Sequence, residues 1–430
     1  MMEKNRLPRL ILLSIILSIL LSTNVGKAQN NVFYNNGILQ VESKTMLSSY
    51  ADFTNQAQGK LVNDGMTYYF GNFTNEGNFT YTKTLATGEV KFVGTKQQNT
   101  IIAGNTTIDL HKVTFDLNQP QYYFDLKANL DVWGEVDFKD GIIKVDSAVN
   151  STTKQPAGLI SFMPKSKHKN SRDTSFIDGM VEKVGADPFV FPIGNKEYYR
   201  PAGISAPQNS KDVVLSNYVF QDSTFFKTHQ AHIPEIKQLN TQEYWKLEKT
   251  KNSQTSFMLT LSWDERTTLP DVLKNSEQDL HIVHWNSANK QWEDLGGIVD
   301  MDNKKITTPA NISNLGYFTL ASMHESPPVE EEDVIIYNYV NANGGNQNDY
   351  FIIKNINRYP QNSVQIFNRW GAKVYETKNY DSQDNVFRGC QTKGGKLPAG
   401  TYYYLITYKK ETKNTSYTIK KTGYLHLDSK

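Results

Sequence analysis

The sequence of 430 residues contains one cysteine, Cys390, and this scarcity excludes two kinds of stabilisation. A single thiol cannot close an intrachain disulfide, and no cysteine-rich metal site can form. Leucine- and alanine-rich blocks, which are typical of helices, are nearly absent after the first 22 residues. Aromatic residues instead make up 12% of the chain, and Tyr, Phe, Val, Ile and Thr suit the pleated surface of a sheet. The composition therefore predicts an all-β protein that depends on packed sheets.

The sequence also lacks the motifs of common enzyme classes. It has no G-x-S-x-G, no phosphate-binding glycine loop and no H-E-x-x-H. Two H-x-x-H pairs occur, His229 with His232 and His281 with His284. On a strand, residues three apart point to opposite faces, so neither pair chelates a metal unless the backbone bends.

Carboxylates and the lone thiol are the remaining candidates for chemistry. Asp264 and Glu265 could be paired acids for sugar hydrolysis, but adjacent strand residues face apart. Asp300 and Asp302 form a fragment of a calcium loop that a hairpin turn explains better. Cys390 has no neighbouring histidine to activate it. The sequence thus predicts no catalytic, cofactor or metal site, and we expect a protein that is not an enzyme.

Residues 1–28 are expected to be a secretory signal peptide. The segment has a basic start, an apolar run and small residues at its end: Lys4, Arg6 and Arg9, then Leu10–Leu21, then Gly26 and Ala28. A membrane anchor needs about 20 apolar residues, and this run is shorter. Cleavage is expected between Ala28 and Gln29, so that the mature chain leaves the cytoplasm.

Residues 29–165 show a loose repeat with a period of about 20 residues. Asn-x-Gly units and a returning F-T-N triplet recur between short β runs: 35–37, 63–65 and 75–77, with 53–55 and 73–75. Asn and Gly tolerate left-handed corners. We therefore expect a β-solenoid-like stack of short parallel strands, with Gly37, Gly65 and Gly77 at its corners. A β-sandwich with Asn-Gly hairpins is the alternative. Residues 132–145 read as strand, turn, strand.

Residues 170–324 predict a β-sandwich. Strand-length runs recur at 243–248, 256–263, 280–286, 291–297 and 315–322, with aromatic residues on one parity. The tryptophans in these runs are expected to fill the core: Trp245, Trp263, Trp285 and Trp292. Residues 152–173 are basic and polar and are interpreted as a loop or boundary. Residues 325–333, ESPPVEEED, are interpreted as a stiff acidic linker.

The charge is distributed unevenly. Residues 334–430 carry 14 Lys and Arg against 6 Asp and Glu, a net charge of +8. Because the whole chain is at +2, the remainder carries −6. A basic terminal domain indicates an acidic partner or an anionic envelope polymer. Nucleic acid is not expected as a partner, because no nucleic-acid-binding motif accompanies the charge.

The last 97 residues contain an ordered set of short motifs. An Asn/Gly-rich turn at 343–351 is followed by VQIFNRWG at 364–371, then by LPAGTYYY at 397–404 and KTGYL at 421–425. In this order they resemble the gliding motility-associated C-terminal domain, the type B sorting domain of the type IX secretion system. The resemblance implies an Ig-like β-sandwich at 334–430. Its signature residues are Asn368, Arg369, Trp370, Gly371, Pro398, Gly400, Thr401, Tyr402, Gly423 and Tyr424.

Several signature residues have a predicted structural role. We expect Trp370 to pack the hairpin, Pro398 to preset a turn and Gly400 to permit a close approach. Where the family has Trp-Asp-Gly, this chain has Phe387-Arg388-Gly389, and we expect Phe387 to fill the core site of the Trp. Exposed lysines form a candidate basic face, although surface lysines also keep edge strands from pairing: Lys373, Lys378, Lys409, Lys410, Lys413, Lys420 and Lys421.

The resemblance also implies an export route and partners. These are the type IX secretion translocon and a PorP/SprF-like outer-membrane protein, with the mature protein on the bacterial cell surface. The repeats at the N-terminus resemble those of surface proteins from gliding bacteria. We therefore expect an adhesin-like or structural protein linked to gliding motility or surface colonisation, with a surface polysaccharide as a candidate ligand. A polysaccharide hydrolase or a passive spacer with the same tail are the alternatives. Asp146-Ser147-Ala148 and Asp222-Ser223-Thr224 match a short O-glycosylation pattern.

Overall fold

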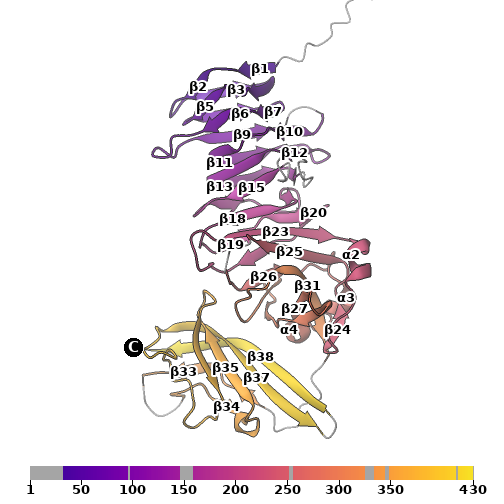
Figure 1. The fold of residues 1–430 in the computed structure, drawn as a ribbon, viewed down its shortest axis with the longest axis vertical. Helices are drawn as coiled ribbons and strands as arrows, with labels where there is room; N and C mark the ends of the chain where they lie inside the picture. The colour runs from indigo at the N-terminus through magenta and orange to yellow at the C-terminus, as the bar shows by residue number, and fades with distance from the viewer. Residues whose placement is uncertain are drawn as a thin grey trace, which may run out of the picture.

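The computed structural model describes residues 32–94, 97–145, 158–250, 255–324, 334–343, 348–412 and 415–429. The predicted signal peptide with its cleavage site at Ala28 and Gln29, the Asp146-Ser147-Ala148 pattern, the linker 325–333 and Lys413 lie outside the described residues. Within those ranges, no helix is long and apolar enough to cross a membrane. The described chain is dominated by strands, as the composition predicts (Figure 1).

The N-terminal half is a stack of short strands that pair in parallel, here called the parallel stack (residues 32–195) (Figure 1). One ladder joins β1 (Val32–Asn35), β4 (Asp52–Asn55), β7 (Phe73–Asn75), β10 (Thr100–Ala103), β12 (Tyr123–Lys127), β14 (Ile142–Val145), β17 (Ile177–Asp178) and β20 (Ile193–Asn195). A second joins β2 (Ile38–Val41), β5 (Lys60–Asn63), β8 (Asn78–Thr80), β11 (Ile108–Asp116), β13 (Asn129–Asp140), β15 (Leu159–Phe162) and β18 (Val181–Val184). A third joins β3 (Met46–Ser49), β6 (Met66–Tyr69), β9 (Glu89–Val93), the later halves of β11 and β13, and β16 (Lys167–Lys169).

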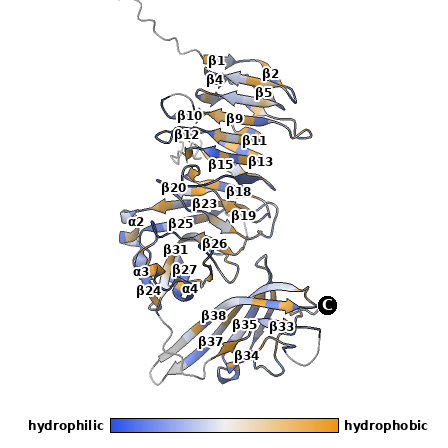
Figure 2. Ribbon diagram, turned by 180° about the vertical axis from the view of Figure 1, so that it is seen from behind, coloured by the Kyte–Doolittle hydropathy of each residue, from blue (hydrophilic) through white to orange (hydrophobic). Residues whose placement is uncertain are grey.

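The parallel pairing expected for residues 30–150 is therefore confirmed, whereas the name β-solenoid remains an interpretation of it. The predicted strand, turn, strand at 132–145 is β13 and β14, joined at Gly141 with φ +100°. Hydrophobic and hydrophilic residues alternate along these strands, which places one set inside the stack and the other outside (Figure 2).

The recurring F-T-N triplets stack on one another inside the stack. Phe53 and Phe73 are buried with ring centroids 5.5 Å apart. Asn35 donates through Nδ2 to Oδ1 of Asn55, and Asn55 donates in turn to Oδ1 of Asn75, both over 2.8 Å. Asn75 donates to Oγ1 of Thr106 at 2.7 Å. Because all three asparagines are buried, the ladder satisfies amide groups that would otherwise be costly to desolvate.

The corner glycines have a different role from the one predicted. Gly37, Gly65 and Gly77 lie between strands as expected, but none of them has a positive φ. A Cβ at Gly65 or Gly77 would instead collide with backbone oxygens of the preceding turn, well inside the 3.0 Å that Cβ atoms keep. At Gly37, no described atom lies within 4 Å of that position. Close approach between successive turns, and not left-handed geometry, requires glycine at the two inner corners.

The stack continues through the segment interpreted as a loop, so that interpretation of residues 152–173 was wrong. Residues 159–162 and 167–169 form β15 and β16, which both pair with β13. Lysines on β16 bind carboxylates on the neighbouring strand: Lys169 lies 2.7 Å from Glu135. A polar strand is stable here because its outward side chains pair with charges one step along the ladder. One hydrophobic cluster runs from Phe53 in the stack to Leu320 in the middle region.

The middle region has two packed sheets, as predicted. One contains β23 (Val213–Phe220), β25 (Glu243–Lys249), β31 (Gly316–Met323), β27 (Leu280–Asn286), β28 (Gln291–Asp294) and β24 (Ile236–Leu239), and β23 pairs with β18 of the stack. The other has the order β19 (Phe189–Phe191), β22 (Ala202–Ile204), β26 (Leu259–Ser262), β30 (Lys305–Thr307) and β29 (Ile298–Asp300). The remaining elements are β21 (Tyr198–Tyr199), α2 (Ser223–Thr228), α3 (Pro270–Leu273) and α4 (Ser276–Asp279). The four predicted core tryptophans are all buried.

The C-terminal module, residues 334–430, has its own core. Its main sheet has the order β33 (Tyr339–Asn341), β38 (Thr415–Asp428), β37 (Gly400–Thr412), β35 (Asn362–Phe367) and β36 (Lys373–Lys378). A smaller sheet pairs β32 (Ile335–Ile336) with β34 (Ile353–Lys354), followed by the 3-10 turn η1 (Ile356–Arg358). Phe387 is fully buried in this core, as expected for a residue in the place of a Trp.

Candidate functional site

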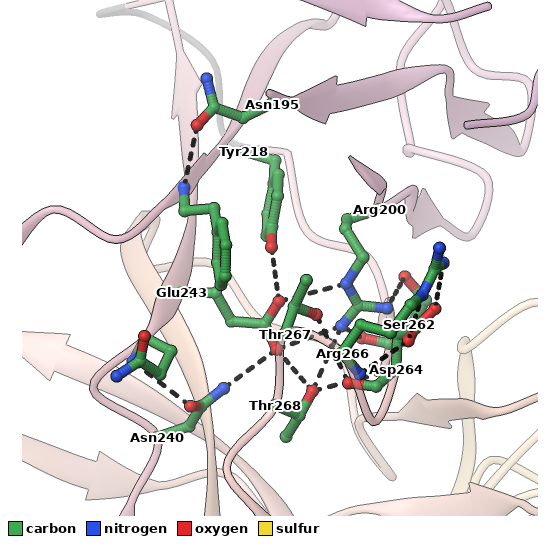
Figure 3. A network of polar contacts seen from close by, with 12 residues as sticks. Asn195, Arg200, Tyr218, Asn240, Glu243, Ser262, Asp264, Arg266, Thr267 and Thr268 are labelled. Atoms are coloured by element: carbon green, nitrogen blue, oxygen red, sulfur yellow. Dashed lines mark hydrogen bonds and ion pairs between the residues drawn. The ribbon is translucent and has the colours of Figure 1, made fainter. Parts of the chain in front are cut away.

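The middle region contains a buried ion pair between Arg200 and Glu243 (Figure 3). The guanidinium donates from Nε and Nη2 to the two carboxylate oxygens, each over 3.1 Å. The same carboxylate accepts hydrogen bonds from Tyr218 at 2.6 Å, Asn240 at 2.9 Å and Thr268 at 2.6 Å. Because both charges are paired and hydrogen-bonded, this network serves the packing of β23, β25 and β26.

The predicted acid pair lies beside this network but is not a pair. The side chain of Arg266 binds Asp264 at 2.6 Å and Asp173 at 2.7 Å. The hydrogen bonds from Arg266 lower the pKa of Asp264 to about 2, so this carboxyl is ionised at neutral pH. Glu265 is exposed and binds Lys304 instead. The two carboxylates therefore have different partners, as adjacent strand residues do.

The other sequence candidates are also placed apart. His229 ends α2 and binds the carbonyl of Phe225, whereas His232 binds the carbonyl of Ile233. His281 binds Asp294 through Nδ1 at 2.8 Å, and His284 lies against the carbonyl of Leu315.

Asp300 accepts from Asn303 in the turn between β29 and β30, which is the predicted hairpin. Cys390 is an exposed free thiol in the C-terminal module. Asp222 caps α2 by accepting from the amides of Thr224 and Phe225. In the described part of the chain, no three His, Cys, Asp or Glu side chains are grouped to hold a metal ion.

A polar cluster on the parallel stack was missed by the sequence reasoning. Lys83 lies 3.3 Å from Asp109 and 4.3 Å from the ring of Trp133, whose Nε1 donates to Asp109 at 3.1 Å. Asp131 lies beside Asp109 in the ladder register. Burial, and then the charges of Asp109 and Glu182, raise the pKa of Asp131 to about 6. Only the parallel register brings these residues together, and a single sequence contains no signal for it.

Aromatic side chains gather at another corner of the stack. The rings of Tyr50 and Phe70 are stacked with centroids 4.3 Å apart, and Tyr68 lies 6.2 Å from Phe70. Tyr50 is 74% exposed. We call Tyr50, Tyr68 and Phe70 the aromatic strip. The repeat of about 20 residues, which relates Tyr50 to Phe70, is the signal that could have revealed it.

The NRWG motif forms the turn between β35 and β36. Oδ1 of Asn368 accepts from the amides of Trp370 at 2.9 Å and Ala372 at 3.0 Å. Gly371 has φ +75°, a conformation that favours glycine. Trp370 was expected to pack the hairpin, but it is 48% exposed because it projects from the turn, where Arg369 lies over its ring at 4.9 Å.

The other signature residues divide between the core and the surface. Tyr402 is buried, and its hydroxyl donates to the carbonyl of Pro398 at 2.8 Å, which fixes the predicted turn. Gly423 leaves room for the ring of Tyr404, which a Cβ would strike. Gly400 was expected to permit a close approach, but no described atom lies within 4 Å of its Cβ position. Its φ of +153° explains the glycine instead.

The surface members lie on the opposite face of the main sheet. Thr401 is exposed and contacts the ring of His426, with Oγ1 and Nδ1 3.3 Å apart. Tyr424 is 49% exposed. Residues 334–427, which include the whole signature, match the family model CHU_C, Type IX secretion signal domain. This segment is a type IX secretion signal domain. The predicted resemblance is thereby confirmed, and we call residues 334–430 the sorting domain.

Because it carries this sorting domain, the protein is a type IX cargo that is exported to the cell surface or the extracellular space. No curated protein is significantly similar to the chain. Among solved structures, dimeric latent PorU from Porphyromonas gingivalis matches 55% of this chain and 26% of that chain, at 13% identity and a TM-score of 0.14. The match thus spans about a quarter of the PorU chain, and at this TM-score it carries no argument.

The candidate basic face of the sorting domain is divided by its contacts. Lys373 binds Glu376 at 2.5 Å, as expected for a lysine that follows a turn at a sheet edge. Lys420 donates to the backbone carbonyl of Asp294 at 3.1 Å, so it faces the middle region. Lys378 and Lys409 are exposed. Whether these exposed lysines contact the secretion machinery stays a prediction.

Proposed function

We propose that the protein is a non-enzymatic, adhesin-like binding protein of the cell surface, and that its parallel stack binds a polysaccharide. The aromatic strip is the observation that carries this proposal. Two of its rings are already stacked at 4.3 Å, and Tyr50 is mostly exposed. A rigid, exposed aromatic platform loses little conformational entropy when a sugar ring packs on it.

The hydroxyls of the strip and the neighbouring charges add polar contacts. Nζ of Lys91 lies 5.3 Å from the ring of Tyr68 and 3.2 Å from Glu89. These groups can exchange hydrogen bonds with sugar hydroxyls. A flat apolar ring beside donors and acceptors is the combination that a carbohydrate surface requires.

A glycan array and pull-down with insoluble polysaccharides would test the proposal, using the mature chain. Tyr50→Ala should weaken binding roughly tenfold, because the loss of one stacked ring costs about 1–1.5 kcal/mol. Tyr34→Ala is the matched control, since Tyr34 is 59% exposed on the same stack but lies outside the strip. Equal binding by both variants and the unsubstituted chain would contradict a role for the strip.

A polysaccharide hydrolase is the second candidate, and the raised pKa of Asp131 favours it. A carboxyl that is protonated near pH 6 can act as a general acid, and Asp109 beside it could remain ionised. Release of reducing sugar by the mature chain, lost in Asp131→Asn and retained in Tyr50→Ala, would establish the hydrolase. Binding without release supports the adhesin.

The sorting domain suggests further partners. We propose that it engages the type IX translocon and a PorP/SprF-like outer-membrane protein, and that the protein acts in gliding motility or surface colonisation. The family of the domain supports this assignment. Co-purification of the tagged chain with the outer-membrane protein tests the partner, and surface spreading of a deletion strain tests the role in motility. A strain that spreads and adheres normally would favour a passive spacer.

A further inference from the structure

The sorting domain lies against the middle region of the same chain. Figure 1 shows it beneath the middle region, with the long strands β37 and β38 running along the boundary. Two separate sets of contacts cross this boundary. One is made by the tip of the NRWG turn, and the other by the outer face of β38.

The first contact is centred on Gly371. A Cβ on this residue would lie 2.7 Å from Cγ of Met258 and 3.2 Å from Oγ of Ser205, and it would also strike Oδ1 of Asn311. All three neighbours belong to the middle region. Gly371 is buried although it stands at the end of a hairpin, and the middle region supplies the atoms closest to it. The turn therefore fits against this surface only because the residue has no side chain.

The second contact is polar. Thr422 donates to the carbonyl of Gly297 at 3.2 Å, and Lys420 donates to the carbonyl of Asp294 at 3.1 Å. The ammonium of Lys420 also lies 4.0 Å from the carboxylate of Asp294. Burial alone would raise the pKa of Asp294, but the hydrogen bond from His281 and the charges of His281 and Lys420 hold it below its usual value. The carboxylate is thus kept charged opposite the lysine.

A cavity of about 450 Å³ separates the two contacts. Arg369 and Tyr403 line it from the sorting domain, and Lys305, Thr307 and Val190 are among the residues that line it from the middle region. Tyr403, Thr422 and Lys420 point to one face of the main sheet, because their neighbours Tyr404 and Tyr402 point into the core. The boundary therefore involves one face of the sorting domain, opposite its core.

We infer that the NRWG turn is a docking element for the cargo itself, and that the type IX machinery reads a different part of the sorting domain. The partner of the turn is the surface formed by Ser205, Met258 and Asn311. Nine residues, 325–333, connect the two parts. A connection this short gives an effective concentration of about 1 mM or more, so even a weak interface stays closed. Tyr339 and Tyr424, which are 44% and 49% exposed, remain accessible to another protein.

Distance measurement between two spin labels would test the docking. One label goes on the natural thiol of Cys390 and the other on Ser287→Cys in the middle region, both of which are exposed. We expect one narrow distance in the mature chain. Gly371→Ala should broaden it, with the undocked fraction rising roughly tenfold or more. Gly394→Ala should leave it narrow, because Gly394 has a similar φ of +86° but no described atom within 4 Å.

A charge reversal provides a second perturbation that does not depend on a glycine. Lys420→Glu places a negative charge opposite Asp294 and should also broaden the distance, whereas Lys409→Glu, on exposed β37, should not. A broad distribution in the unsubstituted chain, or a narrow one in both Gly371→Ala and Lys420→Glu, would overturn the docking.

Surface display in cells with an intact type IX system tests the second half of the inference. Arg369→Ala and Gly371→Ala should be displayed normally, because the turn faces the cargo. Loss of display for Arg369→Ala while the labelled distance remains narrow would show that the machinery reads the turn, and would overturn the assignment.

Discussion

Alanine at the corner glycines of the parallel stack distinguishes close packing from backbone conformation. Gly37 and Gly77 occupy equivalent corners and neither has a positive φ, so alanine strains the backbone at neither position. At Gly77 the added methyl would meet the carbonyl oxygens of Gln56 and Gly59 in the preceding turn. At Gly37, the first corner, no described atom lies within 4 Å.

The expected free energies differ in sign. Backbone oxygens on both sides cannot rotate away, so Gly77→Ala should lower the free energy of unfolding by about 1–3 kcal/mol, the usual cost of overpacking. Gly37→Ala should raise it by about 0.4–1 kcal/mol, because alanine reduces the entropy of the unfolded chain. The two variants should therefore differ by about 1.5–4 kcal/mol.

Urea unfolding followed by circular dichroism measures this difference. With a slope of about 3 kcal/mol per molar urea, the two midpoints should be separated by roughly 0.5–1.3 M. The slopes should match, since the same surface is exposed on unfolding. If both variants lose stability equally, left-handed geometry at the corners explains the glycines and the packing argument fails.

Three further outcomes are expected. Glu243→Gln leaves the buried charge of Arg200 without its partner and should cost about 3–5 kcal/mol in urea unfolding, whereas an unchanged midpoint would deny the pair its structural role. Asp131 has a pKa of about 6 in the folded chain against 3.8 for the free group, so its stabilising contribution is present below about pH 4 and is lost as the pH rises through 6. After allowance for solvent screening the change is about 1–2 kcal/mol, and Asp131→Asn should abolish it between unfolding curves at pH 4 and pH 8. Deletion of residues 334–430 should trap the remainder in the periplasm on cell fractionation, and normal surface display would refute the sorting role.

Strands and core residues were largely predictable from the sequence. The run LHIVHWN at 280–286 forms β27 with the predicted bounds, and the aromatic residues on one parity of these strands are buried. Residues 165–173 were misread, because a strand of lysines is stable only when acidic residues such as Glu135 lie one step along the ladder. That neighbour is about 30 residues away in the chain, beyond the reach of local pattern.

The candidate sites differ in the same way. The signature of the sorting domain could be read because its turns and core aromatics follow one another in order along 60 residues. The aromatic strip and the cluster around Asp131 could not, because each joins residues from successive turns of the stack. Trp370 shows the limit within a single motif: its place in the turn was evident, but its exposure depends on the surrounding module.

The sequence by itself determined the all-β class, the parallel repeat and the sorting domain, because each of these depends on residue type and spacing within a short window. Only the tertiary structure decided why Gly65 and Gly77 are glycines, which carboxyl has a raised pKa and where the NRWG turn points. Those properties depend on atoms from distant segments, such as the oxygens of the preceding turn, the charge of Asp109 beside Asp131, and Met258 against Gly371. Distance through space, and not distance along the chain, sets the energies of overlap, desolvation and charge.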